Sequence, residues 1–580
     1  MTKSKYGFLS LAILIVLAFS SCSMVIENSS PSAPKELIAY AESQDSVRLT
    51  WGAVSGAAEY VLYRSGSLAG DYAEIGSAKT TSFLDRNLAG NKIYYYKVAV
   101  RDKTKSAAVR CRTPSPDYDV PFWAADLRTE GGFYKTWTKR LKTGTHCIVY
   151  GEMPEYTDAP GISESDATGI AETMAKEFDD NIYTKIKDAF GDPTDVDGNG
   201  KVILLLLDVQ DGYDGSVGSS YVAGFFHSND MLQTSYSNKA DMLYIDTWPA
   251  NFKTAEGRAQ IYSTAAHEFQ HLINYSLHHG AGKLNRSMDV WVDEGLASGA
   301  EFIYGGVQQD RIKYFNNNSQ SILKGNNFFV WYDDWNDPLA NYSTVYLFFQ
   351  WLRIHSNNGT GIYKDIISHP DYTDYRAVSE AANKRMGSLG LDFSQWEVLL
   401  RTWLAATFIV NPTGPYGYNN EDAYRNLKAP ALGAGAVKGN TLQLAPGEGV
   451  FSVLSKTLSS IPSGAYGGNI KYAGIKRSPS NGTVTTEMPF TVNTGNRNEE
   501  YYLLTFNSNT KSELTDDADF EAGYVTNIEL PSFSLKAEQK DSGAKLLGGE
   551  DYVPPEPYEW DGARYFFDRN RPPVPSRDRG

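Results

Sequence analysis

Cysteine and histidine are scarce in this chain, whose 580 residues include 3 cysteines and 8 histidines. Apart from Cys22 near the N-terminus, at most one disulfide can form, between Cys111 and Cys147, and two buried free thiols are an equal alternative. Basic patches are also absent, and the net charge of -15 argues against nonspecific nucleic-acid binding. The length exceeds what one hydrophobic core supports, so we expect several globular domains.

The chain begins with a segment that has the features of an export signal. Residues 1–22 contain two early lysines and an apolar run from Phe8 to Phe19, which is too short to span a membrane. The ending FSSC resembles a bacterial lipobox, with Phe19 where Leu is usual, and this resemblance implies lipid attachment at Cys22. The alternative is an ordinary signal peptide that contains a cysteine. We expect an exported, membrane-anchored lipoprotein, located at the outer membrane or cell surface.

Residues 32–113 break into short strand-like runs separated by Gly, Ser and Asn turns, which is typical of a small β-sandwich. The segment resembles a fibronectin type III domain. The features that carry this resemblance are Trp51, Tyr60, the YRSG turn, SFLD at 82–85 and YYYKV at 94–98. The resemblance implies a role in spacing or adhesion and not in catalysis.

A linker-like stretch, TPSPDYDVP, leads into a second region at 120–415. The hydrophobic pattern there favours an α+β domain. It predicts strands within 122–156 and at 201–208 and 241–246, and helices at 162–190, 255–277, 290–303, 342–355 and 374–408. Short β-like runs over 425–535 predict a β-rich C-terminal domain, and the Pro-rich tail at 536–580 predicts disorder. The predicted fold class is therefore multidomain: a β-sandwich, a central α+β domain and a β-rich domain.

The motif H-E-x-x-H spans residues 267–271, inside the helical pattern at 255–277. His267 and His271 are four residues apart, so both imidazoles leave one helix face and can bind a single zinc ion. Glu268 stands beside the first histidine, where it can take a proton from the attacking water as general base. The alternative is a helix with two hydrogen-bonded histidines. The small and apolar residues that flank the pair favour zinc.

A catalytic zinc site needs a third protein ligand and one open position. A metzincin would place Gly at 274 and His at 277, but this chain has Asn274 and Leu277. His278 and His279 follow the helix and precede Gly280, so we expect them to be loop residues at the rim of the cleft. Glu294 lies at the start of a second helical pattern, DVWVDEGLASGAEF, and a helix there can present its carboxylate to the first helix.

HEFQHLIN followed by WVDEGLASGAE resembles the hyicolysin-type family of neutral zinc metallopeptidases, and the likeness extends over about 120–360. This zincin-like, gluzincin-type resemblance implies His267, His271 and Glu294 as zinc ligands and Glu268 as general base. Many gluzincins have an acidic residue four places after the ligand Glu, which orients a ligand histidine. Ser298 stands at that place here, so Ser298 or Glu301 serves instead.

Two further groups of residues are candidates for a role at the site or in its support. Tyr342 and Tyr346, in NYSTVYLFFQWL, could donate a hydrogen bond to the developing oxyanion. DVDGNGK at 195–201 has Asp195, Asp197 and Asn199 at the alternate spacing of a calcium loop. The twelfth position of an EF-hand would be Leu206 and the segment continues into a strand, so the alternatives are a calcium-stabilised turn and a plain Asp/Asn/Gly turn.

These features predict an exported, lipid-anchored zinc endopeptidase that cleaves proteins or peptides with one catalytic Zn²⁺ and a structural Ca²⁺ as a further candidate. Two alternatives stay open. One is a catalytically idle surface adhesin that retains the peptidase fold, against which the intact Glu268 argues. The other is a peptidase directed to glycoproteins through glycan binding by its β-domains. The sequence indicates no oligomeric state.

Overall fold

The computed structural model describes residues 33–128, 132–153, 164–213, 221–317, 328–331, 338–432, 442–454, 456–460, 468–479, 481–493, 495–512, 521–523 and 563–566. The chain divides into two compact units, residues 1–116 and residues 117–580. The boundary falls within the predicted linker. Among the described residues, no helix combines the length and the apolar character that crossing a membrane requires.

The first unit is a sandwich of two antiparallel sheets. One sheet has the order β1 (Ile38–Ser43), β2 (Ser46–Thr50), β5 (Ser82–Asp85), and the other β4 (Ala73–Ala78), β3 (Tyr60–Ser65), β6 (Ile93–Val100), β7 (Val109–Arg112). Asp85 ties the two sheets together, because it accepts hydrogen bonds from Arg64 at 2.8 Å and from the Tyr96 hydroxyl at 3.0 Å. Cys111 is a buried free thiol here, and so is Cys147 in the second unit.

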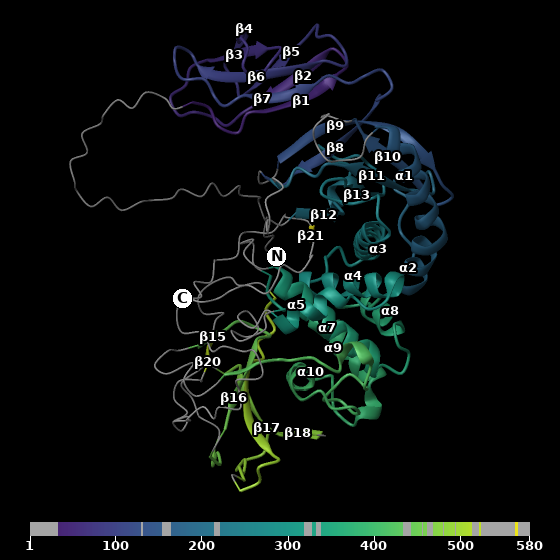
Figure 1. The fold of residues 1–580 in the computed structure, drawn as a ribbon, viewed down its shortest axis with the longest axis vertical. Coiled ribbons are helices and arrows are strands. Elements are labelled where there is room, and N and C mark those ends of the chain that lie inside the picture. The colour runs from purple at the N-terminus through teal and green to yellow at the C-terminus, as the bar shows by residue number, and fades with distance from the viewer. Residues whose placement is uncertain are drawn as a thin grey trace, which may run out of the picture. The chain divides into compact units, whose positions relative to one another are not determined.

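The second unit begins with a seven-stranded mixed sheet (Figure 1). Its order is β21 (Ala563–Phe566), β12 (Tyr221–Phe225), β13 (Met242–Asp246), β11 (Val202–Leu207), β10 (Cys147–Glu152), β9 (Gly132–Thr143) and β8 (Val120–Asp126). The central strands β10, β11 and β13 are parallel, and β12 runs antiparallel to β13. The predicted strands at 201–208 and 241–246 are β11 and β13.

Alternate residues of β11 face opposite sides of this sheet. Leu204 and Leu206 enter a large core with the helices, whereas Leu205 and Leu207 enter a smaller cluster on the other face. Burial on both faces explains the continuous apolar run VILLLL. The predicted helix at 162–190 is interrupted: α1 (Glu164–Glu177) and α2 (Tyr183–Phe190) are joined by a π-helical turn, η1 (Phe178–Ile182).

The remaining helices share the large core with the sheet and lie on one side of it (Figure 1). Their bounds are η2 (Ser228–Met231), α3 (Ala255–His278), α4 (Val290–Gly305), α5 (Gln309–Asn317), α7 (Pro338–His355), α8 (Gly361–Ile367), α9 (Tyr375–Arg385), η3 (Gly387–Leu389), α10 (Trp396–Ile409) and η4 (Asp422–Tyr424). The helical pattern at 374–408 thus contains two α-helices, since the segment SLGLDFSQ interrupts it.

The C-terminal β-rich region is a five-stranded sheet that packs on these helices. Its order is β14 (Ala431–Leu432), β16 (Gly449–Val453), β19 (Glu500–Asn507), β17 (Ile470–Ser478), β18 (Asn481–Thr485), and β15 (Leu442–Leu444) pairs separately with β20 (Glu521–Gly523). Phe408 of α10 stacks on Phe451 of β16 with ring centroids 4.2 Å apart. The predicted C-terminal region therefore shares a core with the α+β region, and both belong to one compact unit.

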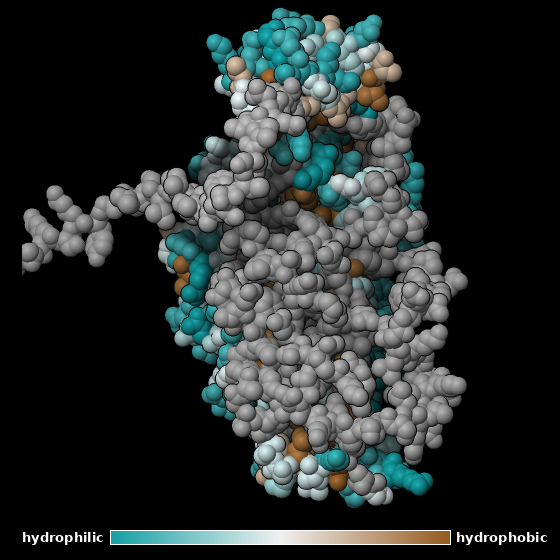
Figure 2. Space-filling view, turned by 90° about the vertical axis from the view of Figure 1, so that its left-hand side faces the viewer, coloured by the Kyte–Doolittle hydropathy of each residue, from teal (hydrophilic) through white to brown (hydrophobic). Residues whose placement is uncertain are grey.

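Within the part of the chain that the structure describes, the tail predicted as disordered contributes one strand, β21. This strand lies at the edge of the seven-stranded sheet. Among the coloured residues in Figure 2, small groups of hydrophobic atoms lie among hydrophilic ones. The large hydrophobic side chains exposed among the described residues are single ones: Leu68, Leu232, Tyr236 and Leu284. Single exposed apolar residues are normal for a folded protein.

Candidate metal centre

Helices α3 and α4 pack side by side and bring the two histidines of the motif to the glutamate that follows them. His267 and His271 lie one helical turn apart on α3, so both face α4. The position of α4 depends on its glycines, since a Cβ added at Gly295 would lie 2.1 Å from Cε2 of Phe349 on α7. Glycine therefore allows α4 to approach α7 closely, next to Glu294.

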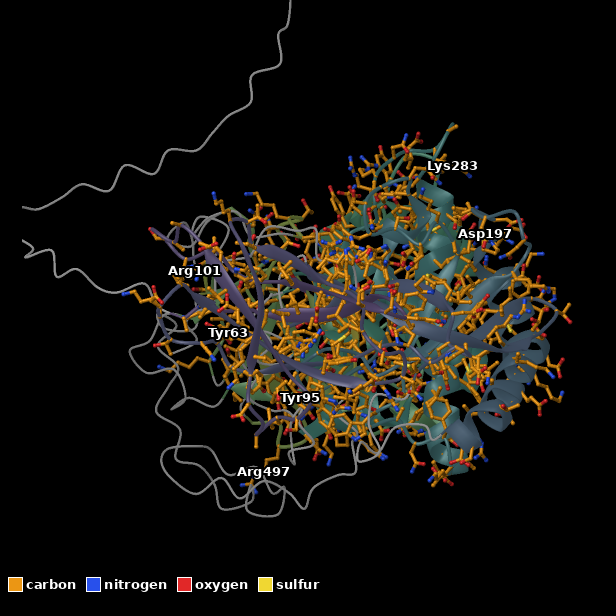
Figure 3. The ribbon with its side chains drawn as sticks, turned by 90° about the horizontal axis from the view of Figure 1, so that it is seen from above. Tyr63, Tyr95, Arg101, Asp197, Lys283 and Arg497 are labelled. Atoms are coloured by element: carbon orange, nitrogen blue, oxygen red, sulfur yellow. The ribbon has the colours of Figure 1, made fainter. Side chains whose placement is uncertain are left out.

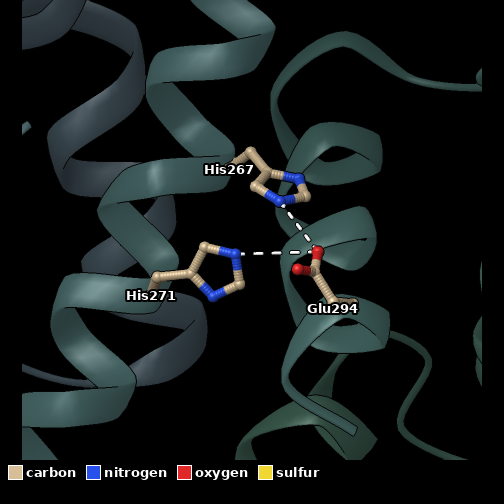
Figure 4. A group of neighbouring side chains, drawn as sticks. All are labelled: His267, His271 and Glu294. Carbon is tan, nitrogen blue, oxygen red and sulfur yellow. Dashed lines mark hydrogen bonds and ion pairs between the residues drawn. The ribbon is translucent and has the colours of Figure 1, made fainter. Parts of the chain in front are cut away.

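The carboxylate of Glu294 faces both imidazoles from the opposite helix (Figure 4). Its Oε2 is 3.1 Å from Nε2 of His267 and 3.7 Å from Nε2 of His271. One ligand atom from each residue lies within 4.8 Å of the others. All three side chains are at most 1% exposed, so the group sits in the interior. The structure thus brings together the three residues that the sequence predicts as metal ligands.

Each histidine also has a carboxylate at the ring nitrogen that faces away from Glu294. Glu301 Oε1 lies 2.8 Å from Nδ1 of His267, and Asp293 Oδ1 lies 3.0 Å from Nδ1 of His271. Such carboxylates fix the ring orientation and leave Nε2 to face the metal position. Ser298 and Glu301 were the two candidates for orienting a ligand histidine, and Glu301 is the one that contacts His267. The Ser298 hydroxyl is buried without a hydrogen-bond partner among the described residues.

The electrostatics of the group favour a cation. Burial lowers the pKa of His267 and His271, but the surrounding carboxylates outweigh it and raise the pKa of both above the ordinary value. Burial raises the pKa of Glu294, but the two imidazoles lower it to about 2. These directions show that positive charge is favoured beside the buried Glu294 carboxylate. A divalent cation bound at this position would supply that positive charge.

Glu268 stands apart from this network, although it is fully buried beside it. No side chain among the described residues hydrogen-bonds to its carboxylate, and the backbone of Phe226 is the group that approaches it. Burial raises the pKa of Glu268 to about 7, and the two neighbouring imidazoles oppose this rise. Burying a carboxylate that no side chain satisfies costs free energy, and such groups are found where they have a functional role. A pKa near 7 suits a group that accepts and returns a proton at neutral pH.

The two candidate tyrosines on α7 have different surroundings. Tyr342 donates a hydrogen bond from its hydroxyl to Glu294 Oε1 at 3.4 Å, so it borders the histidine–glutamate group. The Tyr346 hydroxyl is 3.0 Å from the Tyr424 hydroxyl and accepts from the Gln308 backbone N–H, also at 3.0 Å. Tyr346 is thus engaged elsewhere and does not join the group.

The expectation that His278 and His279 are loop residues at a rim is corrected for His278. Helix α3 extends to His278, whose ring is buried and lies 2.8 Å from the Asn274 carbonyl through Nδ1. His279 caps the helix, stacks on Tyr275 and reaches the Ser287 hydroxyl at 3.1 Å. Both rings have local partners, and neither belongs to the group of metal-ligating residues.

The predicted calcium loop also differs in one member. Asp195 and Asp197 approach Asp241, so that one carboxylate oxygen of each lies within 4.8 Å of the others. Asn199 instead donates its side-chain amide to Asp197 at 2.6 Å, as in an Asp/Asn turn. Asp197 lies on this exposed loop (Figure 3). Calcium binding stays a prediction.

No protein-family model matches the chain. The chain is 36% identical over 263 residues to the neutral metalloprotease ShpI of Staphylococcus hyicus, a match that covers 44% of this chain and 57% of that protein. It is 38% identical over 89 residues to a poly(3-hydroxybutyrate) depolymerase of Ralstonia pickettii, over 14% of this chain and 17% of that enzyme. The chain therefore spans little more than half of the metalloprotease and a small part of the depolymerase.

Among solved structures, the chain is similar to a Fn3-like protein from Clostridium thermocellum, with a sequence identity of 31% and a TM-score of 0.14. The match covers 15% of this chain and 97% of that chain. The FN5 domain of Drosophila Lar matches with 19% identity over 15% of this chain and 99% of that chain, also with a TM-score of 0.14.

Proposed function

We propose that this chain is a zinc-dependent endopeptidase of the hyicolysin type, in which His267, His271 and Glu294 hold the metal. The observation that carries the proposal is the convergence of these three side chains in a buried position, beside the fully buried carboxylate of Glu268. Two imidazoles and one carboxylate form a donor set that suits zinc and leaves a position open for catalysis. Zinc is therefore a better candidate than calcium or magnesium, which prefer oxygen ligands.

When bound there, zinc supplies Lewis-acid chemistry, which polarises a carbonyl group and makes a water molecule more acidic. Glu268 accepts the proton of the attacking water on its carboxylate and returns it to the leaving amine. Glu301 and Asp293 hold the imidazoles in the orientation that directs Nε2 toward the metal position. The Tyr342 hydroxyl, at the edge of the group, is the donor that can stabilise negative charge on the carbonyl oxygen.

The likeness to a neutral metalloprotease supports peptide bonds as the target and proteins or peptides as substrates. The first unit, whose two sheets form a sandwich, serves as a spacer between the catalytic unit and the anchor. Export and lipid attachment at Cys22 rest on the sequence alone, because residues 1–32 lie outside the described residues. This anchor would place the catalytic unit at the outer membrane or cell surface.

Casein hydrolysis by the zinc-loaded chain, compared with its Glu268→Gln variant, tests the proposal. The variant keeps the three ligands, so it should retain zinc, but it should lose hydrolysis by a factor of roughly 10² to 10⁴ because a general base is removed. His279→Ala is the matched control, because His279 caps the C-terminus of the same helix, α3, and its imidazole lies outside the group formed by His267, His271 and Glu294. Equal activity of Glu268→Gln and wild type would overturn the mechanism. Zinc binding without casein hydrolysis by the wild type would favour the idle adhesin.

A further inference from the structure

Strand β12 passes directly beside the proposed catalytic glutamate. A Cβ added at Gly224, in the middle of this strand, would lie 2.7 Å from Thr264 Cγ2 and 3.6 Å from Glu268 Cγ. Glycine at this position thus lets the strand lie against α3 at the level of the H-E-x-x-H motif. On one side β12 pairs with β13, and its other side is its outer edge, which faces away from the rest of the sheet.

That edge is occupied by a segment from the far end of the same chain. Ala563–Phe566 forms β21, which pairs with β12 in parallel. The register places Ala563 opposite Tyr221 and Tyr565 opposite Gly224, with an irregularity between Val222 and Gly224. More than 330 residues separate the two strands in the sequence, so this pairing is not a consequence of local chain connection.

We propose that Ala563–Phe566 is a reversible internal occupant of the outer edge of β12, where it competes with an extended peptide substrate. The inference rests on the proposed function. An extended peptide adds to a sheet edge through backbone hydrogen bonds, which every peptide can make. A peptide substrate aligned on β12 would run past Glu268. The carbonyl group of its scissile bond would then lie where the proposed general base acts. One edge accepts one strand at a time, so the internal strand and the substrate exclude each other.

The internal strand is suited to be displaced. It is four residues long, it pairs in parallel, and its register is interrupted by a bulge-like irregularity. Parallel pairing is somewhat weaker per residue than antiparallel pairing, and an irregularity removes part of the ladder. If the strand is docked in about nine molecules of ten, the apparent KM for a peptide is raised about tenfold and kcat is unchanged.

A full-length variant with Arg564→Pro and Tyr565→Pro tests this arrangement. The backbone N–H groups of successive residues in a strand point to opposite sides. One of the two substituted residues therefore directs its N–H toward β12, and proline removes that N–H. The matched control carries Asp568→Pro and Arg569→Pro, just beyond the strand. Two readouts are measured on zinc-loaded protein: amide hydrogen exchange in residues 221–225, and KM and kcat for a fluorogenic peptide.

We expect the 564/565 variant to exchange faster than wild type over 221–225 and to have a KM several-fold lower at equal kcat, while the control resembles wild type. Unchanged exchange would overturn the docking of β21. Faster exchange at unchanged KM would overturn the competition with substrate. Failure of all versions to cleave the peptide would contradict the proposed function, whereas the exchange result would still decide whether β12 holds the internal strand.

Discussion

The contact between Glu301 and His267 allows a quantitative prediction about metal affinity. The contact is one buried charge-assisted hydrogen bond, with 2.8 Å between Oε1 and Nδ1, and the Glu301 side chain is 3% exposed. Hydrogen bonds to charged groups contribute ~1.5–3 kcal/mol, and loss of such a partner of a metal ligand typically weakens metal binding about 10- to 100-fold. Glu301→Ala should therefore bind zinc about 10 to 100 times more weakly than the wild type.

Two further variants separate the charge of Glu301 from its position. Glu301→Gln keeps an oxygen that can accept from Nδ1 but loses the charge, so we expect a smaller loss, about tenfold or less. Ser298→Ala is the control, because the Ser298 hydroxyl has no hydrogen-bond partner among the described residues. It should bind zinc as the wild type does.

Zinc affinity would be measured by competition with a chromophoric chelator at fixed pH and ionic strength, together with a thermal unfolding curve of each metal-free variant. The unfolding curves show whether a variant has lost affinity because it no longer folds. Wild-type affinity in a folded Glu301→Ala variant, or a loss in Ser298→Ala as large as that in Glu301→Ala, would refute the assignment of Glu301 as the residue that orients His267.

Four other outcomes are expected. Tyr342→Phe should retain zinc but lower kcat for a peptide at least about tenfold, because an oxyanion donor is lost; an unchanged kcat would exclude that role. Burial raises the pKa of Asp365, but hydrogen bonds from Arg385 and Lys384 outweigh it and lower the pKa to about 2. A lowered folded-state pKa contributes stability above the unfolded value and loses it as the pH falls. Asp365→Asn should thus cost ~1–2 kcal/mol in urea unfolding at pH 7, and this difference should shrink as the pH falls from about 4 toward 2; a constant difference would contradict it. Metabolic labelling with a fatty acid should mark the wild type and not Cys22→Ala, and equal labelling would exclude the anchor. Calcium should raise the melting temperature of zinc-loaded protein if the loop binds it, and no shift would leave a plain turn.

Much of the fold follows from periodicity in the sequence. The run VILLLL predicts a buried strand, and β11 is a strand that is buried on both faces. The four-residue spacing of His267 and His271 places them on one helix face, because a helix repeats every 3.6 residues. Glu294 could be placed near them once a second helix was expected to pack on the first.

The features that the sequence did not predict depend on tertiary packing. Asp293 directly precedes Glu294 and was not a candidate, because its contact with His271 depends on how α4 is rotated against α3. Asp241 joins Asp195 and Asp197 only because the sheet brings the start of β13 to their loop. Strand β21 has four residues in a Pro-rich, charged tail, so its pairing with β12 depends on an edge that no local pattern reveals.

The zinc content of Glu294→Ala tests the central claim most directly. Wild type and variant would be loaded with zinc, dialysed against zinc-free buffer and analysed for metal per chain, with circular dichroism to verify that both are folded. The account predicts about one zinc per wild-type chain and a large loss in the variant, because a direct ligand is removed. A folded Glu294→Ala variant that still retains about one zinc per chain would contradict the assignment of His267, His271 and Glu294 as the metal centre.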